Sequence, residues 1–106
     1  MIDINILGTK YEFKAGDLNE RELADADGIC ELYDKQIMVR KPEYMCGNTR
    51  SAKMNRFEHV VRHEIIHAVA KECGVPYVDD EDLVDWIAHI IPIVNDAAML
   101  ILQNIE

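Results

Sequence analysis

Basic side chains are missing from the C-terminal third of this 106-residue sequence, because no lysine or arginine follows Lys71. With 20 acidic and 11 basic residues in all, the formal net charge is -9. A negative field of this kind repels nucleic-acid phosphates and anionic lipid. We therefore expect no nucleic acid and no membrane surface among the partners. The acidic residues that follow Lys71 are Glu72, Asp79, Asp80, Glu81, Asp82, Asp85, Asp96 and Glu106.

Cysteine pairs are also missing. Cys30, Cys46 and Cys73 are an odd number with no CxxC spacing, which argues against a disulfide framework and against a structural zinc knuckle. The first five residues, Met1 to Asn5, lack the basic start and the apolar block of a signal peptide. These absences predict reduced thiols and a cytoplasmic location.

A long uninterrupted apolar run is the third absence. The stretch 83–102 is rich in leucine and isoleucine but contains Asp85, His89, Asn95 and Asp96, which are too many polar groups for a membrane span. We expect a helix that is apolar almost all round, so it is either buried or covered by another chain. A homo-oligomer through this C-terminal helix is one outcome of that pattern.

The N-terminal part reads as strands. Ile2, Ile4 and Ile6 alternate with polar residues, and a reversal at 8–10 leads to a second alternating segment up to residue 14, which predicts a hairpin. Residues 28–40 repeat this logic around a turn at 33–35 and stop before Pro42. The polar segment 17–27 between the two hairpins fits either a short helix or a loop.

Two helices follow. Ser51 can cap the first, whose apolar face continues until Gly74 ends it, and Asp79 or Asp80 can cap the second. Pro92 should kink the second helix or split it in two. We therefore predict an α+β fold in which residues 1–106 form one domain: antiparallel β-hairpins, a helix over the middle of the chain, and a C-terminal helix.

The middle helix contains His63-Glu64-Ile65-Ile66-His67, an HExxH pattern. Imidazoles four residues apart project from one helix face and can bind one metal ion, with the carboxylate of Glu64 beside it as a general base. His59 cannot share an ion with His67, because eight helical residues rise about 12 Å. Two imidazoles leave room for a third protein ligand on a catalytic zinc.

Glu81 is the predicted third ligand. It lies 14 residues after His67, in the first turn of a helix that can return over the metal. Asp79, Asp80 and Asp82 flank it, so the ligand is assigned only to within a position or two. Asp85 follows one turn later, where its carboxylate can accept the second N–H of a ligating imidazole and fix the tautomer of that ring.

These segments resemble a known class of proteins. HEIIH followed by the ExxxD pattern of residues 81–85 resembles the gluzincin branch of zinc peptidases, in which the downstream glutamate is a ligand. Residues 62–68, Gly74 and residues 81–88 are similar to small phage and prophage metallopeptidase-like proteins, and through them to the ImmA/IrrE-type peptidase domain. The resemblance implies a minimal zincin-like fold, a Zn²⁺ cofactor and, for a phage protein, the cytoplasm of a bacterial host.

The implied reaction is hydrolysis of a peptide or protein substrate. Zinc activates a water molecule, and Glu64 takes the proton of that water and passes it to the leaving amine. The substrate can lie along a hairpin edge as an added strand. Tyr77 and His89 are the candidates for stabilising the oxyanion.

Two alternatives remain open. In the first, the chain is a non-catalytic zinc-binding module that binds a phage or host partner through its apolar helix. In the second, HEIIH is an ion-paired helix surface without a metal.

Overall fold

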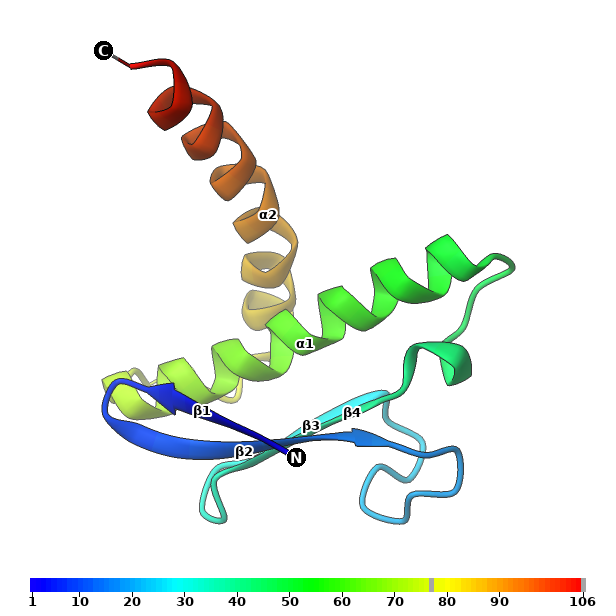
Figure 1. Ribbon diagram of the computed structural model, residues 1–106. Coiled ribbons are helices and arrows are strands. Elements are labelled where there is room, and N and C mark those ends of the chain that lie inside the picture. The colour runs from blue at the N-terminus through cyan, green and yellow to red at the C-terminus, as the bar shows by residue number, and fades with distance from the viewer. Residues whose placement is uncertain (77, 106) are drawn as a thin grey trace.

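The computed structural model describes residues 1–76 and 78–105, and in it a four-stranded mixed sheet precedes two long helices (Figure 1). The predicted α+β class and its order of elements are confirmed. The elements are β1 (Ile2–Ile6), β2 (Thr9–Gly16), β3 (Gly28–Glu31), β4 (Gln36–Arg40), the 3₁₀ turn η1 (Pro42–Tyr44), α1 (Arg50–Cys73) and α2 (Glu81–Asn104).

Both predicted hairpins form, β1 with β2 and β3 with β4, and each is antiparallel. The sequence did not indicate how they join: β2 pairs with β4 in parallel, so that Phe13 lies beside Ile37 and the strand order is β1-β2-β4-β3. Strand β3 therefore lies at an edge of the sheet. It pairs with β4 on one side, leaves its other side open, and contacts α1.

The connection 17–27 is a series of turns, so the loop alternative is right. Arg40, at the end of β4, is only 8 % exposed, and its guanidinium donates hydrogen bonds to the backbone carbonyls of Leu18, Ala24 and Ala26. Burying an arginine is costly unless its donors are satisfied, and here backbone oxygens satisfy them. One side chain thus positions the loop that leads into β3.

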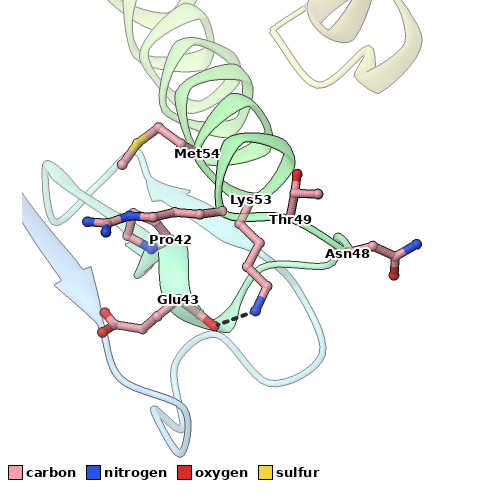
Figure 2. Close-up of a pocket in the computed structure, with 7 residues that line it drawn as sticks. Pro42, Glu43, Asn48, Thr49, Lys53 and Met54 are labelled. Carbon is pink, nitrogen blue, oxygen red and sulfur yellow. Dashed lines mark hydrogen bonds between the residues drawn. The ribbon is translucent and has the colours of Figure 1, made fainter.

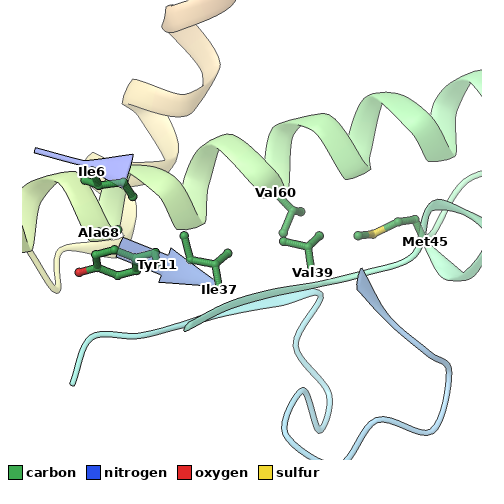
Figure 3. Close-up of a cluster of buried hydrophobic side chains, with 7 residues drawn as sticks. All are labelled: Ile6, Tyr11, Ile37, Val39, Met45, Val60 and Ala68. Carbon is green, nitrogen blue, oxygen red and sulfur yellow. The ribbon is translucent and has the colours of Figure 1, made fainter. Parts of the chain in front are cut away.

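The core lies between one face of the sheet and α1. Side chains from the strands point toward the helix, and Val60 and Ala68 of α1 face them (Figure 3). Their burial is nearly complete, since Tyr11, Val39 and Ala68 are all 0 % exposed. The cluster consists of Ile6, Tyr11, Ile37, Val39, Met45, Val60 and Ala68.

The helix ends confirm two of the three predicted signals. Gly74 ends α1 with φ of 72°, and the Asp80 carboxylate caps α2 by accepting from the backbone N–H of Leu83. The cap predicted at Ser51 is wrong. Thr49 takes that role with an extended backbone, and its hydroxyl accepts from the N–H of Ala52 at 3.0 Å, whereas Ser51 is already helical.

Helix α2 projects away from the sheet and α1 (Figure 1). Only Val84 and Ala88 are buried in it, so of the two alternatives expected for this helix, burial within the chain is not found among the described residues, and coverage by another chain stays a prediction. Pro92 does not split α2, which is continuous over 24 residues. By length and composition alone, α2 is also long and apolar enough to cross a membrane. The expectation that no membrane is involved stays a prediction.

A polar cluster fixes the C-terminal end of α1 against the sheet. The carboxylate of Glu72 accepts hydrogen bonds from the Lys35 ammonium at 2.9 Å, the Tyr11 hydroxyl at 2.7 Å and the Thr9 hydroxyl at 2.8 Å. The bonds from Lys35, Tyr11 and Thr9 lower the pKa of Glu72 to about 2. Burial and the bond to Glu72 raise the pKa of Tyr11 to about 12. The ionised carboxylate is therefore favoured in the folded state.

We expect Glu72→Gln to lower the melting temperature at pH 7. Because the pKa of Glu72 is depressed on folding, its contribution to stability is complete above its ordinary pKa of 4.5 and is lost as the pH falls toward about 2. The difference in melting temperature between wild type and variant, measured by circular dichroism, should decrease as the pH falls from 5 to 3. Glu58→Gln, an exposed position of the same helix, is the control. A pH-independent difference would contradict this account.

Candidate metal centre

His63 and His67 lie one turn apart on α1 and point to the same place. Their Nε2 atoms are 3.2 Å apart, and their ring centroids are 4.9 Å apart. The spacing of four residues produces this because such residues lie on one helix face. Both side chains are largely shielded from solvent, with 14 % and 9 % exposed. The predicted pair of imidazoles is therefore brought together.

Glu81 reaches both rings from the first turn of α2. Its Oε2 lies 2.7 Å from His63 Nε2, and its Oε1 lies 3.1 Å from His67 Nε2. Within the acidic run, Glu81 is the residue whose carboxylate approaches both rings. Asp80 is used as the helix cap, while Asp79 and Asp82 are exposed. Burial opposes ionisation of Glu81, but the hydrogen bonds and charges of His63 and His67 outweigh it and lower its pKa.

The second nitrogen of each ring faces an acceptor. His67 Nδ1 lies 2.6 Å from the backbone carbonyl of Val78, and His63 Nδ1 lies 3.2 Å from Asp85 Oδ1. Carbonyl and carboxylate oxygens only accept, so both Nδ1 atoms donate. In the neutral rings, both Nε2 atoms then carry lone pairs directed at the shared point.

Two nitrogen lone pairs and a carboxylate therefore converge. Such a set is repulsive unless a positive charge, a shared proton or a metal ion, lies at its centre. Ligand atoms about 2.1 Å from a tetrahedral zinc are about 3.4 Å from one another, which is slightly wider than the 2.7–3.2 Å found here. His63, His67 and Glu81 thus form a group that could hold a metal ion.

Asp85 contacts two histidines through one oxygen. Besides His63, its Oδ1 accepts from Nε2 of His59 at 2.7 Å. The bond from His59, together with that from His63, lowers the pKa of Asp85 against the opposing effect of burial. His59, His63 and Asp85 also lie close enough together to hold an ion, whereas His59 and His67 do not share a group among the described residues. This agrees with the prediction that His59 and His67 are too far apart along the helix to bind one ion.

Glu64 is buried, with 7 % exposed, and lies between α1 and the edge strand β3. Burial raises the pKa of its carboxyl, while the charges of His63 and His67 act in the opposite direction. Gly28 of β3 makes this position accessible: a Cβ there would lie 2.6 Å from Val60 Cγ1 and 3.1 Å from Glu64 Oε2. A side chain at this position would clash with Val60 and crowd the Glu64 carboxylate.

A cleft of about 360 Å³ runs past Glu64 along the edge of β3. The backbone N–H of Arg40 donates to Asp27, one residue before β3, so alternation directs the N–H and C=O groups of Gly28 and Cys30 away from β4. These groups face the open edge. The cleft is lined by Ala26, Gly28, Ile29, Cys30, Leu32, Glu64, His67, Asp79 and Glu81.

A separate hollow of about 440 Å³ lies where α1 begins (Figure 2). Its wall includes Pro42, Thr49 and Met54, and Lys53 donates to the carbonyl of Glu43 at 3.4 Å. This hollow contains no histidine or cysteine. It is more than two helical turns from His63 along α1 and contributes nothing to the metal-holding group.

Other residues considered from the sequence lie elsewhere. Tyr77, a candidate for stabilising an oxyanion, lies outside the described residues, and His89 is exposed on α2. Cys30, Cys46 and Cys73 are unpaired, and burial raises the pKa of the Cys30 thiol to about 12. The sequence predicted neither the contact of the Val78 carbonyl with His67 nor the position of Gly28 beside Glu64. Of the two, only Gly28 could have been noticed, as a small residue at the start of a strand.

The chain has no significant match among family models, curated proteins or solved structures.

The contact with Val78 makes a spectroscopic prediction. We expect His67 to carry its hydrogen on Nδ1, because the Val78 carbonyl can only accept. Long-range proton–nitrogen correlation spectra of the labelled protein report which ring nitrogen is protonated. His89, which is exposed, serves as the internal control and should exchange between tautomers. A His67 ring that exchanges in the same way would contradict this geometry.

Proposed function

We propose that this chain is a small zinc-dependent peptidase of the gluzincin type, with His63, His67 and Glu81 as ligands and Glu64 as the general base. The observation that supports this most directly is the convergence of two oriented Nε2 atoms and the Glu81 carboxylate beside a buried glutamate. The phage origin and cytoplasmic location implied by the sequence resemblance remain predictions.

The donor set favours zinc over the harder cations. Two imidazole nitrogens and one carboxylate oxygen are typical ligands of a catalytic zinc, whereas magnesium and calcium prefer sites built from oxygen alone. The contacts to Asp85 and Val78 orient both rings before any ion binds. When bound, zinc would supply a Lewis acid that activates water and polarises a carbonyl.

Glu64 is suited to proton transfer. Its carboxyl is buried beside the ligands, and a raised pKa brings a carboxylate closer to the range in which it can both accept and return a proton near neutrality. In the proposed reaction, Glu64 accepts the proton of the attacking water and delivers it to the amine that leaves. The absence of a side chain at Gly28 leaves this carboxylate open to the cleft.

The edge of β3 provides a place for an extended peptide. The outward N–H and C=O groups of Gly28 and Cys30 can pair with a substrate backbone, which would add a fifth strand to the sheet. A peptide in that position passes Glu64 and the ligands along the cleft. Backbone pairing of this kind places few demands on the side chains of the substrate.

We expect purified protein to bind one zinc ion per chain, measured by elemental analysis and by titration calorimetry. His63→Ala and Glu81→Gln should lose most of this affinity because each removes a ligand. Asp85→Asn should weaken binding by about 10- to 100-fold, the usual effect of losing a group that orients a ligand. Met99→Lys, on exposed α2 surface far from the site, is the matched control. Unchanged zinc binding by His63→Ala would exclude this centre.

Catalysis is tested separately with Glu64→Gln, which keeps the size of the side chain but cannot accept a proton. We expect zinc binding to be retained and cleavage of an unfolded protein substrate to fall by about 10² to 10⁴-fold. Glu58→Gln, on the exposed side of α1, should cleave like wild type.

Equal cleavage by wild type and Glu64→Gln would reject the mechanism. A zinc-binding wild type that cleaves no substrate would favour the alternative of a non-catalytic interaction module, in which the same site stabilises the contact between α1 and α2.

A further inference from the structure

Most of α2 is not used by the site. Its first turn carries Glu81 and Asp85, and only Val84 and Ala88 are buried. Beyond these positions the helix leaves the body of the protein (Figure 1). Large apolar side chains on it are more than half exposed: Trp86, Ile93, Val94, Met99, Leu100, Ile101 and Leu102. Contiguous exposed apolar surface on this scale marks an interaction site.

The apolar residues form a stripe with a regular spacing. Alternating steps of four and three residues connect Leu83, Ile87, Ile90, Val94, Ala97 and Ile101. This heptad repeat is the pattern of helices that supercoil about one another, with the β-branched residues Ile87, Val94 and Ile101 at every seventh position. The chain thus carries three repeats of a coiled-coil seam.

The seam lies on the far side of α2 from the body. At 100° per residue, Glu81, Val84, Asp85 and Ala88 occupy the face toward α1, and the seam falls nearly opposite. The polar residues of the C-terminal half, Asn95, Asp96 and Gln103, also lie off the seam. A partner helix can therefore approach the seam without contacting α1 or the metal-holding residues.

We infer that this stripe pairs with the same stripe of a second copy of the chain. The helix is about 36 Å long, and covering the seam together with the flanking Trp86 and Ile93 on two copies would remove on the order of 1,000 Å² from water. That area reaches the lower limit of a specific protein interface. The helix has no lysine or arginine and cannot form ion pairs with a second copy of itself. Pairing through the apolar seam does not require them.

A lipid bilayer fits the helix less well. Only about 24 Å of α2 extends past Ala88, which is short of the hydrocarbon thickness of about 30 Å, and Asn95 and Asp96 lie in the middle of that length. Helices that lie on a membrane surface carry lysine or arginine on their polar face. This helix has neither.

The two copies pair in antiparallel orientation. Glu81, Asp82 and Asp85 are gathered at the N-terminal end of α2. A parallel pair would bring these two acidic clusters together, whereas an antiparallel pair places them at opposite ends and aligns the helix dipoles favourably. Each metal-holding group then lies at its own end of the pair, facing away from the shared seam.

The test is sedimentation equilibrium of the full chain across the micromolar range. Wild type should reach the mass of two chains, and Val94→Lys and Ile101→Lys should each raise the dissociation constant by about tenfold or more. Leu102→Lys is the matched control, because Leu102 is 66 % exposed and Ile101 64 %, but Leu102 lies off the seam. Each of these side chains is more than half exposed in the single chain, so the variants should fold.

Trp86 provides a second readout. It is the single tryptophan, it is 59 % exposed, and it lies beside the seam. Its emission should shift to shorter wavelength as wild type is concentrated and should stay fixed in Ile101→Lys. A monomeric wild type, an equal loss in Leu102→Lys, or flotation of wild type with neutral phosphatidylcholine vesicles would each overturn the inference. None of these measurements depends on zinc or on cleavage.

Discussion

The packing of α1 across one face of the sheet is the constraint on which the other features depend. Val60 and Ala68 bury themselves against the strands, so the rotation of the helix about its axis is set by the core. With that rotation fixed, His63 and His67 face α2, and Glu64 lies against the edge strand β3. The bonds from Lys35, Tyr11 and Thr9 to Glu72 secure the same orientation at the last turn. Stability and the candidate chemistry therefore use one helix, on adjacent faces.

Local patterns predicted the elements but not their assembly. Alternation and turn residues predicted both hairpins, and Gly74 and Asp80 marked helix ends, because each of these signals acts within a few residues. The parallel pairing of β2 with β4 and the burial of Arg40 arise from contacts between distant segments. Glu81 could be named from spacing and charge, whereas the Val78 carbonyl could not, since every residue has a carbonyl and only the fold directs this one to His67.

The first turn of α2 and the rest of the helix differ in composition and in exposure. Its first turn is acidic, which suits both the helix dipole and the imidazoles of α1. Its remainder is apolar and largely exposed, and a long exposed apolar helix is costly for a single chain in water. A sequence that keeps both features in one continuous helix couples whatever covers the apolar stripe to the position of Glu81 and Asp85.

The joint between α1 and α2 has a further consequence. Few apolar side chains are buried there, and the polar contacts between the two helices are those of Glu81 and Asp85 with the histidines of α1 among the described residues. An ion held by groups from both helices would link α1 to α2. The free energy of metal binding would then also stabilise the docking of α2 against α1. The angle at which α2 leaves the body would then depend on metal supply. Removing the ion would loosen the helix while leaving the core between α1 and the sheet intact.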